Sequence, residues 1–295
     1  MPHLTRLQFL QAAASLPLFL AKSLPAVASE EAGRTILYST DFVTDFDVND
    51  RGVGRDGRPC WRSDFAYGGR IVNNGERGLY ADPHVFPGTE PFPVVDGQRR
   101  LRSQRLAKPI QWKGTSYAYS AALMSAPHIA VSVGQRVECD LSLPHVMRKG
   151  YWPGFWLMPI KDAKERDWPW PPEIDVMEWW LFNEGDRADA FWNSLHSGTP
   201  AAHVNDARQI DLASLGIAGD LTQVLTYAVE ITESEITCFV NDREVSRRAN
   251  PAPSRQWYII LNLAVAGDPW PGAPDDAAQF PQEVVLKGLR VLARR

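Results

Sequence analysis

The feature that most constrains the fold of this chain is a series of short segments in which apolar and polar residues alternate. Clusters of Gly, Pro, Asn and Asp separate these segments, and alternation with a period of two is typical of β-strands with one buried face. Hardly any segment shows a helical period. We therefore predict an all-β protein with strands at residues 35–39, 70–73, 100–106, 117–125, 136–143, 151–158, 174–181, 190–196, 225–231, 235–240, 257–265 and 284–291.

Strands in this number form a two-sheet sandwich, and a sandwich of about 250 residues is commonly one domain. The sequence shows no internal repeat or long linker that would divide it, so we predict one domain over residues 29–295. A short helix is expected at residues 211–221. Residues 29–34 and much of the Pro-rich stretch 83–97 are expected to be surface loop.

The composition is that of a globular protein with a sizeable core, because 44% of the 295 residues are hydrophobic and 22% are charged. Lys and Arg number 31 against 35 Asp and Glu, which gives a net charge of −4. No long basic run is present that could follow a phosphate backbone. These observations argue against nucleic acid as a partner.

The first 28 residues have the pattern of an export signal. Arg6 precedes a mostly apolar stretch at residues 9–21, and the small residues Ala26, Val27 and Ala28 form a cleavage site. The stretch is shorter than the ~20 apolar residues of a membrane-spanning helix, so we expect cleavage after Ala28 and no membrane anchor. Residues 5–10 resemble a degenerate twin-arginine signal, and the predicted location is the periplasm or the outside of the cell.

Cysteine and metal patterns add little to these expectations. Cys60, Cys139 and Cys238 are an odd number without C-x-x-C spacing, which argues against structural zinc. In an oxidising compartment two of them could form a disulfide, or all three could be small buried residues. Residues 45–50 are acidic like a calcium loop, but Asp50 replaces the glycine required at the sixth position, so we assign no metal ligand.

Three carboxylates lie close together at Glu173, Asp175 and Glu178. In a regular strand Glu173 and Asp175 share a face and Glu178 points the opposite way. A bulge at Val176–Met177 would return Glu178 to their face, and bulges are frequent beside active sites. A solvated acidic strand face is the plain alternative, but clustered carboxylates in an apolar neighbourhood are retained mainly where perturbed pKa values are useful.

Tryptophan is concentrated around these carboxylates. The chain has 11 Trp, and six of them fall within 29 consecutive residues: Trp152, Trp156, Trp168, Trp170, Trp179 and Trp180. Alternation places Trp152 and Trp156 on one face, and past the bulge it places Trp180 on the face of Glu178. Core packing is the alternative for each, and we expect it for Trp179, which has the opposite parity.

The segment E-x-D-x-x-E at residues 173–178 resembles the signature of glycoside hydrolase family 16, in the laminarinase-like branch whose catalytic strand is bulged. Other segments are similar to family motifs in the expected order: residues 135–138 and 151–159, the hairpin at 227–230 and 239–242, and residues 260–267 with 270–272. The resemblance implies a β-jelly-roll sandwich whose concave face forms a cleft for polysaccharide.

The resemblance also implies roles for the carboxylates. Glu173 matches the nucleophile, Glu178 the acid/base and Asp175 a helper that orients Glu173. A retaining glycosidase needs two carboxyl groups about 5–5.5 Å apart, one ionised and one protonated. Glu178, flanked by indoles and close to Glu173, is expected to have a raised pKa.

Five further residues are predicted to bind substrate, because indole faces suit the apolar faces of sugar rings and a buried amide or imidazole could meet sugar hydroxyls. They are Trp152, Trp156, Trp180, His196 and Asn262. His196 could equally be a structural histidine. Trp168 and Trp170 lie in the loop before residue 173 and are expected either to border the cleft or to pin the loop. Asp140 stands where the family pattern has a basic residue of a sugar subsite.

The expected function is that of an exported, endo-acting, retaining glycosidase that hydrolyses a β-linked polysaccharide, with β-1,3-glucan as the default substrate. A galactan or exopolysaccharide substrate, transglycosylation, and a non-catalytic carbohydrate-binding module are the alternatives. We expect a monomer that requires no cofactor. Some members of the family hold a structural calcium, for which we assign no residues.

Overall fold

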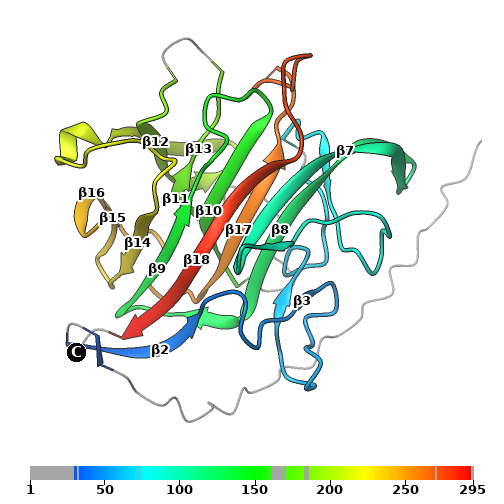
Figure 1. The fold of residues 1–295 in the computed structure, drawn as a ribbon. Coiled ribbons are helices and arrows are strands. Elements are labelled where there is room, and N and C mark those ends of the chain that lie inside the picture. Colours follow the sequence, from blue (N-terminus) through cyan, green and yellow to red (C-terminus); the bar gives the residue numbers. More distant parts are fainter. Residues whose placement is uncertain are drawn as a thin grey trace, which may run out of the picture.

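The computed structural model describes residues 30–31, 33–72, 74–160, 168, 171–182, 186–269 and 271–293. These residues form two mainly antiparallel sheets that lie over one another (Figure 1), which we call sheet A and sheet B. The predicted all-β fold is confirmed. The predicted signal at residues 1–28 lies outside the described residues, and no helix within them is long and apolar enough to cross a membrane.

Sheet A has β18 near its centre (Figure 1), with β9 on one side and β2 and β7 on the other. From one edge its strands are β16 (Arg243–Ala249), β15 (Glu235–Val240), β14 (Leu225–Ile231), β9 (Gln135–Ser142) and β18 (Gln282–Ala293). On the other edge of β18, β2 (Arg34–Thr40) pairs with its C-terminal part and β7 (Gln98–Trp112) with its N-terminal part. The short strands β1 (Glu30–Glu31) and β6 (Val94–Val95) pair with β2 and β7.

Sheet B carries the motif strand in its interior. Its strands are, in order, β13 (Ala202–Asp211), β12 (Ala190–Thr199), β11 (Glu173–Glu178), β10 (Tyr151–Pro159), β17 (Trp257–Val265) and β8 (Thr115–Val131). The short strands β4 (Trp61–Arg62) and β5 (Gly78–Tyr80) pair with β8, and β3 (Val48–Asn49) pairs with β4.

The hairpin of β7 and β8 joins the two sheets, because β7 pairs with β18 at one end and with β8 at the other. Its two-residue turn, Lys113–Gly114, has φ values of 47° and 81°. Left-handed conformations at both positions match the right-handed twist of the strands that they connect.

Two apolar clusters explain why β10 and β17 are largely apolar on both faces. The main core lies between the sheets and includes Phe155 and Leu261 of sheet B with Val137 and Val229 of sheet A. A second cluster, which includes Phe65, Tyr80, Trp152, Tyr258 and Ile260, lies on the other face of sheet B, where the segment that contains Phe65 and Tyr80 covers part of the strands. We call this outward face of sheet B the site face.

The predicted strands agree with the structure except at residues 70–73, where residues 70–72 form no strand and residue 73 lies outside the described residues. Arg70 is buried there, and its guanidinium donates to the carbonyl oxygens of Ser63 and Tyr80 at 3.4 and 3.1 Å. The alternating pattern at residues 70–73 is therefore not that of a strand, because Arg70 is buried to hydrogen-bond a loop and β5. The segment predicted at 174–181 ends as a strand at Glu178.

Two long strands were missed because they lie at sheet edges. β13 and β16 each pair with one neighbour, and β13 is mostly exposed, so neither shows a clear apolar alternation. The helix expected at 211–221 is only a single 3₁₀ turn, η1 (Ala213–Leu215), which ends at Gly216 in the left-handed conformation. The expected loops at 29–34 and 83–97 contain β1, the start of β2 and β6.

All three cysteines are free and buried, as the apolar alternative anticipated. Trp179 is also a core residue, as predicted. It is 1% exposed, its ring packs against Tyr151, and its Nε1 donates to the carbonyl oxygen of Arg187 at 2.9 Å.

We predict that Trp179→Ala lowers the free energy of unfolding by about 3–5 kcal/mol, because it opens a cavity and removes a buried hydrogen bond. Urea denaturation measures this value. Val204→Ala on the edge strand β13 is the control, and its 55% exposed side chain should change stability by less than about 0.5 kcal/mol. Similar losses in both variants would contradict the core assignment.

Candidate active site

The bulge predicted in β11 is present. On one side, Phe155 and Trp156 of β10 pair with Met177 and Asp175, so Val176 is the extra residue. Against β12, Asp175 and Glu178 pair with Ser194 and Trp192, so two residues of β11, Val176 and Met177, lie opposite the single residue Asn193. Val176 and Met177 both lie in the main core, and Glu173, Asp175 and Glu178 therefore share the site face.

Asn193 of β12 holds the bulge from the core side. Its Nδ2 donates to the carbonyl oxygens of Asp175 and Val176 at 2.8 and 3.2 Å. Its Oδ1 accepts hydrogen bonds from Ser246 and Arg248 of β16 at 2.6 and 2.5 Å. The polar groups that an irregular strand leaves unpaired thus have buried partners.

Sequence reasoning missed this role of Asn193, although a signal was present. Asn193 has the parity of Phe191 and Leu195, which point into the main core. An amide at an inward position requires partners. Its alternation with apolar core residues could have identified it as a support for an irregular neighbour.

Glu178 lies among aromatic rings at the end of β11. Trp152 Nε1 donates to Glu178 Oε1 at 3.0 Å. Trp180 packs against both Trp152 and Trp192, with ring centroids 6.1 and 5.6 Å apart. Trp152 is only 6% exposed, so it presents its indole N–H to Glu178 and most of its ring is covered.

The pKa values of the three carboxyl groups are raised. Burial, followed by the charge of Asp175, raises the pKa of Glu178 to about 8, as the expectation for this residue required. Burial raises the pKa of Asp175 to about 7, although Arg248 opposes the shift. Burial and Asp175 also raise the pKa of Glu173, and His196 opposes this. Groups this close titrate together, so near neutral pH the cluster shares protons.

His196 contacts the cluster from β12. Its Nε2 lies 3.2 Å from Asp175 Oδ2, while its Nδ1 lies 2.9 Å from Nε2 of His203 on β13. The first contact is not aligned as a hydrogen bond, and Asp175 Oδ2 is buried without a hydrogen-bond partner among the described residues. The ring of Trp168 packs on both imidazoles, at 5.3 and 4.5 Å between centroids.

Trp168 and Tyr67 present aromatic surface beside Glu173. Trp168 is 44% exposed and its side chain hydrogen-bonds Glu173. Tyr67 is 64% exposed, stacks on Phe65 at 5.3 Å, and is close enough to Glu173 for their charges to interact. Tyr67 lies in a loop without periodicity, so its sequence gave no signal; Trp170 lies outside the described residues.

Asn262 supports Trp156. Its Oδ1 accepts from Trp156 Nε1 at 2.9 Å, and its Nδ2 donates to the Tyr80 hydroxyl at 3.0 Å. Tyr80 interacts with Glu76, a fourth carboxyl group whose pKa burial raises to about 7. The side-chain amide of Asn262 was predicted to bind sugar hydroxyls, but Trp156 and Tyr80 are its hydrogen-bond partners. We therefore assign Asn262 the role of positioning Trp156.

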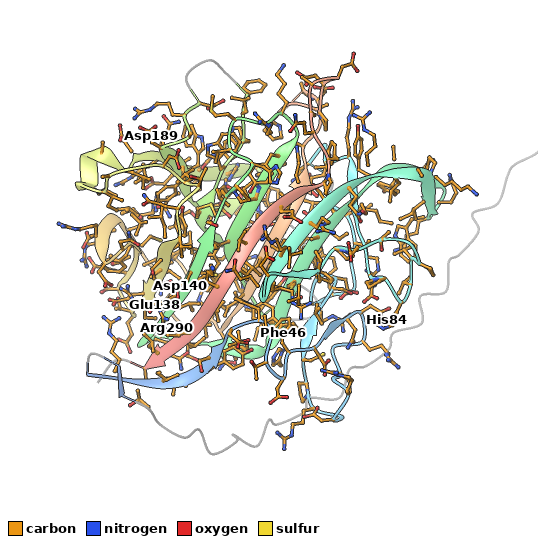
Figure 2. The ribbon with its side chains drawn as sticks, viewed as in Figure 1. Phe46, His84, Glu138, Asp140, Asp189 and Arg290 are labelled. Carbon is orange, nitrogen blue, oxygen red and sulfur yellow. The ribbon has the colours of Figure 1, made fainter. Side chains whose placement is uncertain are left out.

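Asp140 does not lie with these residues. It belongs to β9 of sheet A, where it accepts from Thr226 at 2.6 Å and pairs with Arg290 at 3.2 Å. Figure 2 shows Asp140, Glu138 and Arg290 together on β9 and β18. The inference that Asp140 replaces a basic residue of a sugar subsite is therefore corrected, because position 140 is part of an ion-pair network on the opposite sheet.

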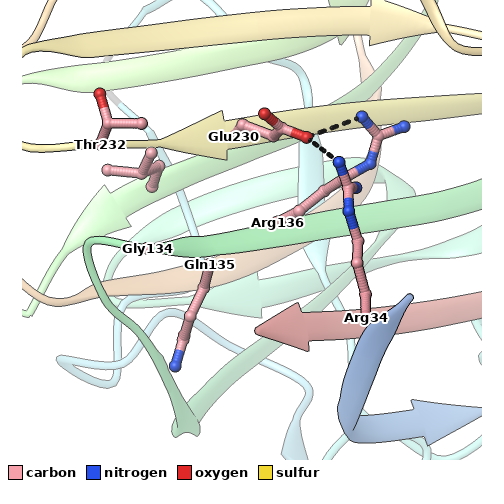
Figure 3. Close-up of a pocket in the computed structure, with 7 residues that line it drawn as sticks. Arg34, Gly134, Gln135, Arg136, Glu230 and Thr232 are labelled. Atoms are coloured by element: carbon pink, nitrogen blue, oxygen red, sulfur yellow. Dashed lines mark hydrogen bonds and ion pairs between the residues drawn. The ribbon is translucent and has the colours of Figure 1, made fainter. Parts of the chain in front are cut away.

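The small pocket in Figure 3 is also on sheet A. Glu230 there accepts from Arg34 and Arg136 at 2.5 and 3.3 Å. The pocket has a volume of about 10 Å³, which is room for one water molecule at most and too small for a sugar ring. The carboxylate cluster on the site face is the better candidate for chemistry.

Comparisons with known proteins find sequence and structural similarity to endo-acting β-glycanases. The endo-1,3-1,4-beta-glycanase ExsH of Rhizobium meliloti is 26% identical over 241 residues, which cover 79% of this chain and 47% of that protein. A laminarinase catalytic domain from Thermotoga petrophila matches at 21% identity with a TM-score of 0.67, covering 89% of this chain and 98% of that one. SCLam, a non-specific endo-beta-1,3(4)-glucanase from family GH16, matches at 22% identity with a TM-score of 0.66, covering 90% and 94%. No family model matches the chain.

The chain is thus similar in sequence to curated β-glycanases, and it has the fold of solved laminarinases and of a solved member of glycoside hydrolase family 16. Its fold is the jelly roll of that family, as the resemblance implied. The chain spans about half the length of the curated relatives it matches, 47% of one and 49% of the other.

One group of side chains in the site has the composition of a metal site. Glu173, Asp175 and His196 each place an oxygen or nitrogen within 4.8 Å of the others. Both ring nitrogens of His196 are already in contact with side chains of the protein. We assign no metal ligands here.

We predict that Asn193→Ala destabilises the protein and lowers kcat, because it removes both donors to the bulge. Each buried group left without a partner costs about 1–3 kcal/mol, and a displacement of about 1 Å in a catalytic group can cost ~10²-fold in rate. Urea denaturation and steady-state kinetics measure the two effects. Asn205→Ala, on the exposed strand β13, is the control, and an unchanged kcat in Asn193→Ala would refute the support role.

The raised pKa of Glu178 also predicts a pH dependence of stability. The folded protein binds this proton more tightly than the unfolded chain, whose carboxyl has the ordinary pKa of 4.5. Stabilisation is therefore present below that value and is lost as the pH rises through about 8. Between about pH 5 and pH 9, the Tm of Glu178→Gln should therefore fall less than the Tm of the wild type.

Glu244→Gln is the matched control for this measurement. Its pKa is lowered by Arg247, so its contribution has the opposite sign and its removal should not flatten the profile. Parallel Tm profiles for Glu178→Gln and the wild type would show that Glu178 titrates normally.

Proposed function

We propose that this chain is an endo-acting retaining glycosidase of family 16 that hydrolyses β-glucan by double displacement. The observation that carries the proposal is the bulge, which gathers Glu173, Asp175 and Glu178 on one face beside exposed aromatic rings. Among the described residues, no Lys or Arg is within ion-pairing distance of Glu173 or Glu178. A binding module would have little use for three gathered carboxyl groups whose burial disfavours their charge.

In the first step, ionised Glu173 attacks the anomeric carbon while Glu178 donates its proton to the leaving glycosidic oxygen. The raised pKa of Glu178 keeps it protonated near neutral pH, and the Trp152 N–H orients its carboxyl group. In the second step, ionised Glu178 removes a proton from water, which attacks the anomeric carbon and releases Glu173. Asp175, between them, holds a proton that can hydrogen-bond Glu173.

The substrate class follows from the aromatic surfaces and from the relatives. Trp168 and Tyr67 lie beside Glu173, and Trp156 is paired with Asp175 on the neighbouring strand. These side chains offer indole and phenol faces to sugar rings. The similar proteins are named for β-1,3 and β-1,3-1,4 linkages. We therefore propose β-1,3-glucan or mixed-linkage glucan as substrate.

We propose further that residues 1–28 direct export and that the enzyme acts in the periplasm or outside the cell. The basic residue, apolar stretch and small-residue site described above support this. A large polysaccharide is met in those compartments.

Both Glu173→Gln and Glu178→Gln are expected to lower kcat at least about 10²-fold on laminarin without loss of the folded state. Reducing-end release against laminarin, lichenan, agarose and carrageenan measures activity and substrate class together, and Glu244→Gln is the control. Wild-type rates in either variant would refute the assignment. Products longer than the starting oligosaccharide would reveal transglycosylation.

Azide distinguishes the two roles, because it is a nucleophile that needs no general base. In Glu178→Ala it should react with the glycosyl-enzyme and give a glycosyl azide of retained configuration. In Glu173→Ala it should occupy the nucleophile's place and give the inverted product. The reverse pattern would exchange the assigned roles.

A further inference from the structure

Asp175 is the most enclosed of the three carboxyl groups. It is 3% exposed, whereas Glu173 and Glu178 are only partly buried. Its pKa near 7 means that it gains and loses a proton in the neutral range, yet its own carboxyl group has little contact with water. A polysaccharide chain bound over the site face would reduce that contact further.

Two imidazoles connect Asp175 with the protein surface. His196 Nε2 is 3.2 Å from Asp175 Oδ2, and His196 Nδ1 is 2.9 Å from His203 Nε2. The two rings are stacked with centroids 5.1 Å apart. His203 is exposed on β13, so this row of contacts runs from a buried carboxyl group to solvent.

Each member of the row carries a group that can both take up and release a proton. Partial desolvation, followed by the neighbouring His196, lowers the pKa of His203, so near neutral pH His203 is a neutral imidazole that can accept. Trp168 packs on both rings and holds them in register. An imidazole can take up a proton at one nitrogen and release one from the other, and its ordinary pKa is close to neutral pH.

The charged groups around the row favour an Asp175 that holds its proton until Glu173 loses its charge. Glu173 and Glu178 on β11 disfavour ionisation of Asp175, while Arg248 of β16 favours it. On β13, Asp206 and Arg208 form an ion pair with each other, and Asp206 also contacts Arg248. When Glu173 becomes an ester, the negative charge moves to Glu178, and Glu173 becomes a weaker acceptor for the proton of Asp175.

We propose that Asp175, His196 and His203 form a proton relay in which His203 exchanges protons with solvent. On formation of the glycosyl-enzyme, Asp175 Oδ2–H gives its proton to His196 Nε2, while His196 Nδ1–H gives its proton to His203 Nε2. His203 becomes imidazolium and Asp175 becomes a carboxylate. The second step reverses both transfers as Glu173 regains its charge, so no proton is gained or lost over the cycle. The inference rests on the proposed function.

The test is buffer rescue of His203→Ala. We expect kcat on laminarin to fall by about tenfold, less than the ~10²-fold that a direct general acid or base contributes. Added imidazole should restore it in a concentration-dependent way, and should not accelerate the wild type. His203→Gln can hydrogen-bond His196 but cannot pass a proton, so it should be as slow as His203→Ala and respond less to imidazole.

Two results would overturn the relay. One is a kcat in His203→Ala equal to that of the wild type or of the control Val204→Ala. The other is a slow His203→Ala that imidazole does not restore while His203→Gln is fully active, which would make His203 a purely structural partner.

A readout without substrate separates this inference from the proposed function. In ¹⁵N-histidine NMR spectra, the His196 Nδ1 resonance should shift between wild type and His203→Ala, because its hydrogen-bond partner is removed. An unchanged resonance refutes the contact even if the enzyme is active. A wild type that hydrolyses none of the four polysaccharides refutes the proposed function, and the spectra still decide whether the contact exists.

Discussion

One extra residue in β11 is the constraint on which the site depends. Without it, Glu178 would point into the main core, because a shift of one residue moves every later side chain to the other face of a sheet. The irregularity exposes the carbonyl oxygens of Asp175 and Val176, and Asn193 satisfies both. Ser246 and Arg248 hold Asn193 in turn, so strands from both sheets contribute to placing one carboxylate.

The same geometry sets the electrostatics. Three carboxyl groups on neighbouring same-face positions cannot all ionise cheaply when burial disfavours their charge, and near neutral pH they share protons. A nucleophile and an acid need opposite protonation states at one pH. The Trp152 N–H at Glu178 and the imidazole of His196 beside Asp175 make the surroundings of the carboxyl groups different from one another.

Sequence periodicity predicted most strands because their core faces follow a period of two, and the same parity argument located the bulge. It failed where burial does not alternate. β13 and β16 are edge strands with mostly polar faces, and the buried Arg70 lies in a loop. Asn262, His203 and Tyr67 act through partners distant in the chain, such as Tyr80 and Trp168, and no local pattern specifies those contacts.

The two faces of sheet B explain why tryptophan is concentrated in β10 and directly after β11. The inward residues of this region fill the main core, and its outward residues must both form part of a second apolar cluster and present rings to Glu178 and Asp175. Indole meets both needs, since its ring packs like a core residue while its N–H satisfies a buried acceptor such as Glu178 or Asn262. Among the described residues, the outer face of sheet A is polar instead, and ion pairs such as those of Glu138 and Asp140 with Arg290 connect its strands.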